Sequence, residues 1–370
     1  MKLIAAVILT LLFGDYGSHA LSVPPVHTIF IILFENQDWS AFKDSPDAPY
    51  INHTLLPMAS HCENYFNPPG LHPSLPNYLW LEAGTNFGVF DDHDPSVNHQ
   101  ATTNHLSSLL NGKGISWKAY QEDIPGTSVP LTAINGYVPK HDPFVYFDDV
   151  TGINNPGDAY GIAHIRPYTE LITDLASNTV ARYNFITPNL CDDGHDSCPP
   201  QENQVRQTDD WLAGEIPKIL SSSAYSNNGA IFITWDEGAG GNDGPIGMIV
   251  LSPLVRGGYF NNIRYTHSSL LRTFQEIFGV APLLGDAANA NDLSDLFAAL
   301  AIFQATGSSN GFSFSVTGIV PGRTNLLEAS TNLTAWTTVG TNVSATNSFT
   351  AVDADATNYS RRFYRVMEVH

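Results

Sequence analysis

The sequence predicts an α/β fold with a mostly parallel sheet sandwiched by helices, followed by a small antiparallel β module. The apolar, β-rich segments are nearly continuous rather than alternating, which is typical of strands buried on both faces. Helical patterns separate these segments, and strands that alternate with helices favour a parallel sheet. After Phe303 the composition changes to short segments rich in Thr, Val and aromatic residues, which indicates the β module.

The expected elements follow one another along the chain. The strands are 26–34, 115–120, 183–187, 230–235 and 248–251, and the helices are 104–110, 168–177, 207–220 and 268–278. Pro76 can sit in the first turn of a further helix that runs through Ala83, where its missing N–H costs nothing. Residues 121–165 form a long insertion rich in Pro, Gly, Asp and aromatic residues. Such a loop is either a lid or wall of a functional site or a surface insertion without a role.

The two ends of the chain differ from its middle. Residues 1–20 have the pattern of a secretory signal peptide, with a charged start, a short apolar run and a small-residue cleavage site. No later segment has the length of a transmembrane helix. We therefore expect a protein that is secreted, periplasmic or on the cell surface, without stable membrane insertion. We expect the main domain over 21–305, a flexible linker over 306–311 and the β module, of unknown role, over 312–370.

Charge excludes one class of partner. The chain carries 36 acidic and 16 basic residues, a net charge of −20. Binding to nucleic acid requires Lys and Arg to neutralise phosphates, so we expect no nucleic-acid partner. The chain also has three cysteines. Their spacing favours a disulfide between Cys191 and Cys198, and a bridge from Cys62 to either of them is the alternative.

Polar clusters follow three of the expected strands. They are Glu35-Asn36, the segment 188–196 and Asp236-Glu237. A single cluster of this kind is more often a turn than a site, but the carboxyl ends of parallel strands lie at one edge of a sheet, where ligands bind. Two consecutive acids also need solvent or a cation to offset their repulsion.

A divalent cation could be held by Glu35, Asn36, Asp236 and Glu237. Oxygen ligands of this kind suit Ca²⁺, Mg²⁺ or Mn²⁺. Zn²⁺ is the alternative if His72 or His195 also coordinates the ion.

Ser74 lies in the segment HPSLPNY, just before the expected helix. Its hydroxyl could cap that helix by accepting a backbone N–H. Alternatively, the helix N-terminus could bind a phosphate, and a metal on the serine oxygen would make it a nucleophile. His72, His195 and His267 stand out because each lies in or near these clusters.

Five motifs, in order, resemble a known family: Glu35-Asn36, HPSLPNY, PNLCDDGHD, TWDEG and YTHSSLLRTFQEIFG. They resemble the phosphoesterase family of bacterial and fungal acid phosphatases and non-specific phospholipases C, which has an alkaline-phosphatase-like α/β/α fold. The resemblance covers about 26–297 and makes the main domain the catalytic domain.

The resemblance also implies roles for residues. It implies a metal held by Glu35, Asn36, Ser74, Asp236 and Glu237, and it implies that Ser74 forms a phosphoseryl intermediate. His72 and His195 would bind phosphate oxygens or assist the leaving group. His267 falls in a family motif and joins the candidate catalytic residues.

The expected function is a secreted, metal-dependent phosphoric-ester hydrolase of the acid-phosphatase type. One alternative is a phospholipase C that cleaves phosphodiester head groups; its family members carry lipid-binding elaborations that this compact domain lacks. Another is an inactive exported protein whose β module binds glycans, against which the intact set of Glu35, Asn36, Ser74, Asp236 and Glu237 argues. A formylglycine sulfatase is disfavoured because position 74 lacks the C/S-x-P-x-R context.

Overall fold

The structure is a computed structural model that describes residues 23–297, 301–308, 311–319, 322–346 and 348–369. The expected signal peptide, residues 1–20, lies outside the described residues. Within the described residues, no helix is long and apolar enough to cross a membrane.

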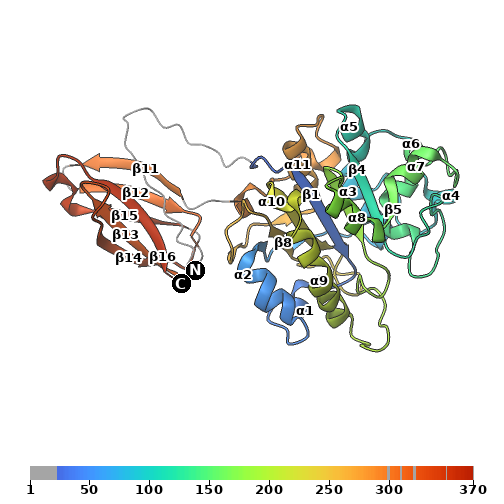
Figure 1. The fold of residues 1–370 in the computed structure, drawn as a ribbon, viewed down its shortest axis with the longest axis horizontal. Helices are drawn as coiled ribbons and strands as arrows, with labels where there is room; N and C mark the ends of the chain where they lie inside the picture. The colour runs from blue at the N-terminus through green and yellow to red at the C-terminus, as the bar shows by residue number, and fades with distance from the viewer. Residues whose placement is uncertain (1–22, 298–300, 309–310, 320–321, 347, 370) are drawn as a thin grey trace.

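The main sheet has eight strands in the order β5-β4-β6-β1-β7-β8-β2-β9 (Figure 1). The strands are β1 (Thr28–Phe34), β2 (Ser60–Cys62), β4 (Trp117–Gln121), β5 (Ile165–Pro167), β6 (Tyr183–Thr187), β7 (Gly229–Trp235), β8 (Met248–Leu251) and β9 (Tyr259–Asn261). Neighbours from β5 to β7 are all parallel, which confirms the predicted mostly parallel sheet. β8 runs antiparallel to β7 and β2.

The helices confirm the sequence pattern, with ends that differ by a few residues. They are α1 (Trp39–Phe42), α2 (Leu56–Met58), α3 (Ser74–Ala83), α4 (Pro95–Asn98), α5 (Leu106–Gly112), α6 (Asp148–Thr151), α7 (Ala159–His164), α8 (Thr169–Ser177), α9 (Gln204–Leu220), α10 (Ser223–Ser226) and α11 (His267–Phe278). β3 (Tyr65–Phe66) and β10 (Tyr265–Thr266) form a separate parallel pair. The insertion 121–165 folds into short helical turns, including the 3₁₀ helix η2 (Pro139–His141).

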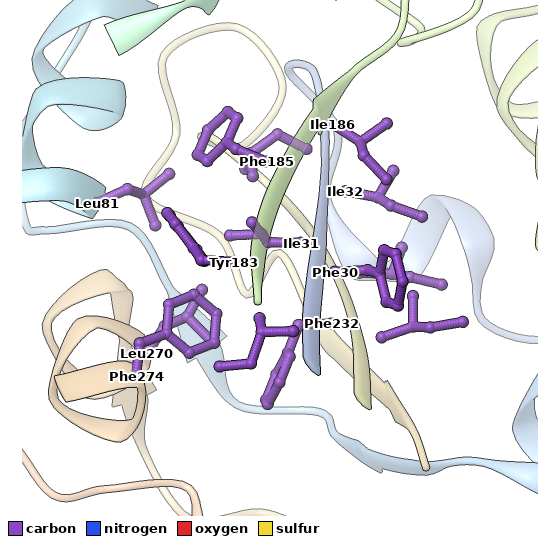
Figure 2. Packing of buried hydrophobic residues seen from close by; sticks show 14 of the residues in the cluster. Phe30, Ile31, Ile32, Leu81, Tyr183, Phe185, Ile186, Phe232, Leu270 and Phe274 are labelled. Atoms are coloured by element: carbon purple, nitrogen blue, oxygen red, sulfur yellow. The ribbon is translucent and has the colours of Figure 1, made fainter. Parts of the chain in front are cut away.

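The core lies on both faces of the central strands (Figure 2). Successive side chains of a strand point to opposite faces. On one face, Phe274 of α11 packs edge-on against Phe232 and Tyr183, with ring centroids 5.0 and 5.7 Å apart. On the other, Phe34 packs edge-on against Trp211 of α9. This two-sided burial explains why the strands read as continuous apolar runs, and their parallel pairing places their carboxyl ends at one edge of the sheet.

The C-terminal strands form two antiparallel three-stranded sheets, β11-β12-β15 and β14-β13-β16 (orange to red in Figure 1). The strands are β11 (Ala301–Ser308), β12 (Gly311–Thr317), β13 (Thr324–Ser330), β14 (Thr337–Val343), β15 (Ser348–Asp353) and β16 (Phe363–Val369). The buried residues of this β module include Phe314, Val316, Tyr364 and Val366. Residues 306–308, expected in a linker, instead end β11 and pair with β12. Gly, Ser and Thr suit hairpins as well as linkers, so composition did not distinguish the two.

Candidate active site

The carboxyl ends of β1, β6 and β7 bring the predicted clusters together. The backbone N–H of Glu35 donates to the carbonyl oxygen of Asp193 at 2.9 Å, and that of Asp236 donates to Phe34 at 3.0 Å. The bond of Asp236 continues the pairing of β1 with β7, and the bond of Glu35 holds the loop after β6 against the end of β1. The side chains of Glu35, Asp193 and Asp236 are all fully buried.

Ser74 is the first residue of α3 and points toward this edge. Its Oγ donates to Oε2 of Glu35 at 3.0 Å. Pro73 takes the N-cap position and the Ser74 side chain makes no capping bond, so the capping interpretation does not describe this helix. One turn later, Nδ2 of Asn77 donates to Glu237 at 3.0 Å and to the Leu71 carbonyl oxygen at 2.9 Å.

Glu35 is the centre of the cluster. Besides Ser74, it accepts a hydrogen bond from the hydroxyl of Tyr78 at 2.5 Å, and its Oε2 lies 3.3 Å from Nε2 of His141. Burial, followed by the charges of Asp236 and Asp193, raises the pKa of Glu35 well above its usual value. Burial and the neighbouring carboxylates therefore both disfavour the ionised form of Glu35.

His141 and Asp193 strengthen the case for a cation beside Glu35. Nδ1 of His141 lies 3.1 Å from Oδ2 of Asp193, a contact that with ionised Asp193 favours the tautomer protonated at Nδ1, and burial lowers the pKa of the imidazole well below its usual value. Nε2 then directs a lone pair at the carboxylate of Glu35, and two acceptors at 3.3 Å repel unless a cation or proton lies between them. One ligand atom from each of Glu35, His141 and Asp193 lies within 4.8 Å of the others.

Asp236 gives a second observation that fits a cation. Its Oδ1 accepts from the backbone N–H of Asn36 at 3.1 Å, whereas no described residue forms a hydrogen bond with its buried Oδ2. Burial, followed by the charge of Glu237, raises the pKa of Asp236 to about 7. A buried carboxylate oxygen without a donor is costly. The donor set of Glu35, Asp236 and their neighbours therefore fits a divalent metal ion.

His72 and Glu237 form a pair beside this cluster. Nδ1 of His72 lies 2.6 Å from Oε2 of Glu237, and Nε2 lies 3.0 Å from Oδ1 of Asp243. Although burial opposes it, the contacts with Glu237 and Asp243 raise the pKa of His72 above its usual value. Both ring nitrogens are thus engaged by carboxylates, and His72 holds Glu237 in place.

His195 lies at the more exposed side of the site. Its Nδ1 lies 2.7 Å from Asp196, and its Nε2 lies 3.2 Å from the ammonium nitrogen of Lys140. The disulfide between Cys191 and Cys198, which the spacing favoured, closes the loop that carries Asp193 and His195. Cys62 is a free, buried thiol.

His267 is fully buried and lies behind the carboxylates. Its Nε2 donates to the backbone carbonyl oxygen of Asp236 at 2.7 Å, and its Nδ1 lies 3.1 Å from the hydroxyl of Tyr65. With both nitrogens engaged by protein groups, His267 is suited to holding the Asp236 backbone rather than to contacting substrate.

Sequence reasoning missed His141, Lys140 and Tyr78 as site residues. His141 and Lys140 come from the 121–165 insertion, for which the sequence leaves open a functional role or none. Pro139-Lys-His-Asp-Pro143 is the one place in that insertion where a cation and an imidazole adjoin between two prolines. Tyr78 belongs to the expected helix, and its position four residues after Ser74, on the same helical face, is the signal that could have identified it.

This chain is similar in sequence to known proteins. The sequence model of the Phosphoesterase family matches residues 45–281, more than half of the chain. A phosphatidylinositol-3-phosphatase of Mycobacterium tuberculosis is 29% identical over 282 residues, which cover 76% of this chain and 86% of that protein. The phosphate-repressible acid phosphatase of Penicillium chrysogenum is 30% identical over 226 residues, covering 58% of this chain and 51% of that protein.

More distant similarities agree with these matches. Phospholipase C A of M. tuberculosis is 23% identical over 276 residues, which cover 62% of this chain and 50% of that protein. This chain therefore spans about half the length of the fungal phosphatase and of the phospholipase. Among solved structures, a protein of the alkaline phosphatase superfamily from Vibrio parahaemolyticus has a TM-score of 0.51 at 11% identity, covering 87% of this chain and 84% of that one. That likeness shows the fold.

Proposed function

This chain belongs to the Phosphoesterase family and is a phosphoric ester hydrolase, and from that premise we propose that Ser74 is its nucleophile toward phosphate monoesters. The observation that carries the proposal is the 3.0 Å hydrogen bond from Ser74 Oγ to Glu35 Oε2 at the N-terminus of α3. A buried hydroxyl next to a carboxylate can lose its proton as it attacks. The helix N-terminus favours the approaching phosphate.

Glu35, Asn36, Ser74, Asp236 and Glu237 would hold the metal ion, with His141 adjacent. When bound, the ion would lower the pKa of the Ser74 hydroxyl and offset negative charge at the phosphate. Ca²⁺, Mg²⁺, Mn²⁺ and Zn²⁺ remain the candidates, because the site offers oxygen ligands together with an imidazole.

The reaction proceeds by displacement at phosphorus. The oxygen of Ser74 forms a bond to phosphorus while its proton passes to Oε2 of Glu35, and the bond to the alcohol oxygen breaks. The departing alcohol oxygen takes up a proton from solvent that reaches the site beside His195, its more exposed imidazole. Water then hydrolyses the phosphoserine and regenerates the hydroxyl. His72 and His267 keep Glu237 and Asp236 in position.

The test compares two buried serines. Ser74→Ala should abolish hydrolysis of p-nitrophenyl phosphate while the thermal unfolding transition is retained. Ser60→Ala, at a buried hydroxyl of β2, is the control and should keep activity. Acid quenching during turnover should trap phosphate on Ser74, detectable by mass spectrometry. Full activity of Ser74→Ala would contradict the assignment.

The substrate class is tested by a panel. We infer that soluble monoesters are hydrolysed faster than bis-p-nitrophenyl phosphate or phosphatidylcholine micelles; the reverse order would favour a phospholipase C. Export is inferred from the pattern of residues 1–20 alone.

A further inference from the structure

Lys140 is the cation that the insertion 121–165 brings to this acidic site. It belongs to η2, next to His141, whose ring stacks on Tyr78 of α3 with centroids 5.3 Å apart. His141 is fully buried against Glu35, so the backbone that carries Lys140 is anchored at the centre of the site. The Lys140 side chain itself is only 20% exposed.

Asp92 connects Lys140 to the nucleophile. One carboxylate oxygen, Oδ2, accepts from Nζ of Lys140 at 3.1 Å. The other, Oδ1, accepts from the backbone N–H of Leu75 at 3.0 Å, and Leu75 directly follows Ser74. A single carboxylate thus fixes the ammonium relative to the first turn of α3.

The ammonium retains a donor for a ligand. A lysine ammonium has three N–H donors. Within the described part of the chain, Asp92 and Nε2 of His195, 3.2 Å away, take two of them. Both partners of Lys140 connect it to the site, because Asp92 also binds the amide that follows Ser74 and His195 belongs to the loop of Asp193.

Charge explains why such a cation is needed. Glu35, Asp193, Asp236 and Glu237 surround the place where a phosphate must approach Ser74, and a phosphate monoester is itself a dianion. The positive charge of Lys140 acts on Glu35, Asp193 and Glu237, lowering the pKa of each against the raising effect of burial. Lys140 is therefore close enough to interact electrostatically with an anion bound among them.

We propose that Lys140 binds the phosphate oxygens of the substrate, and that Asp92 is the residue that positions its ammonium beside Ser74. This inference rests on the proposed function and deepens it, because a cation at this place favours substrates with more negative charge on the phosphate. A monoester brings two negative charges and a diester one, so Lys140 favours monoesters over diesters.

The experiment removes the charge at two matched lysines. Lys118 is the control, since it is 25% exposed and is also paired with an aspartate, Asp174, away from this site. Lys140→Met should weaken competitive inhibition by inorganic phosphate at least tenfold and lower kcat/KM more for p-nitrophenyl phosphate than for bis-p-nitrophenyl phosphate. Lys118→Met should leave phosphate inhibition and the kcat/KM values for the two esters unchanged. Lys140→Arg, which keeps the positive charge, should retain part of the phosphate affinity that Lys140→Met loses.

Unchanged phosphate inhibition in Lys140→Met would overturn the proposal while leaving the phosphatase function standing. If the wild-type protein hydrolysed none of the esters, the proposed function would fall. Calorimetric titration with phosphate would then still test Lys140, and equal affinities of wild type and Lys140→Met would overturn its role.

Asp92 is tested through a double-mutant cycle. Asp92→Asn keeps an acceptor for the Leu75 amide but removes the partner charge of Lys140. It should weaken phosphate inhibition less than Lys140→Met does, and the double variant should be no weaker than Lys140→Met alone, because the two residues act through one ammonium. Additive losses would show that Asp92 acts independently and would overturn the positioning role.

Discussion

Nε2 of His267 donates to the backbone carbonyl oxygen of Asp236 at 2.7 Å, while the hydroxyl of Tyr65 lies 3.1 Å from Nδ1. Burial lowers the pKa of His267 to about 4, so above that pH the imidazole is neutral and its one N–H faces Asp236. The side chain at the start of α11 therefore holds the backbone of Asp236, the residue that follows β7 and carries the carboxylate. This relationship joins two motifs that are distant in the sequence.

His267→Ala should weaken metal binding about 10- to 100-fold, because residues that orient a ligand have effects of that size. The measurement is metal content after dialysis, together with activity as a function of free metal. His267→Gln, which can donate to the same carbonyl oxygen, should recover part of the affinity. Normal metal affinity in His267→Ala would contradict the positioning role.

Removing the metal should destabilise the protein, because Glu35, Asp193 and Asp236 then remain buried together without a cation. A ligand present at a hundred times its dissociation constant stabilises by about 2.7 kcal/mol. Thermal unfolding after chelation, with Ca²⁺, Mg²⁺, Mn²⁺ and Zn²⁺ added back one at a time, measures the effect. Asp236→Asn, of the same shape, should show a smaller shift; no shift with any metal would argue against a metal site.

Reducing the disulfide should affect activity more than the fold. Cys191 and Cys198 are seven residues apart, and a loop this short contributes about 2 to 3 kcal/mol in the chain-entropy description. The same loop carries Asp193 and His195, so reduction should lower kcat while the protein stays folded. Enzyme assays and denaturant unfolding with and without dithiothreitol test this. The Cys191→Ser/Cys198→Ser variant is the control, since its activity should not respond to the reductant.

Glu82 should make stability fall as pH rises. It is fully buried on α3 and accepts from the hydroxyl of Tyr183 at 2.7 Å and the N–H of Ser107 at 3.2 Å. Burial raises its pKa from 4.5 to about 7, so between these pH values the folded state holds a proton that the unfolded state has lost. Folding is therefore increasingly disfavoured from about pH 4.5 upward, and the cost levels off above pH 7.

Glu82→Gln mimics the protonated carboxyl and removes that cost. The free energy of unfolding of Glu82→Gln minus that of wild type should be larger at pH 8 than at pH 4.5. The increase in this difference should be about 3 kcal/mol. Urea denaturation at the two pH values measures the difference. Glu202→Gln, at an exposed position, is the control. An equal offset at both pH values would show that Glu82 does not titrate in this range.

The strands, the major helices and the disulfide could be predicted because each depends on residues close in sequence or on burial patterns along one element. Continuous apolar runs such as 230–235 indicate burial on both faces, and Gly279 ends α11 in the left-handed conformation that glycine favours. Asp236 and Glu35 could likewise be anticipated, because both directly follow such strands.

The sequence by itself determined the α/β architecture, the family motifs and the edge of the sheet where the polar residues gather. Only the tertiary structure decided which side chains meet there. His141 and Lys140 come from an insertion without periodicity, and their contacts with Glu35 and Asp92 depend on how that insertion packs on α3. The β11–β12 hairpin likewise follows from strand pairing. Local sequence sets backbone preference and burial, whereas contacts between distant segments depend on the packing of the whole chain.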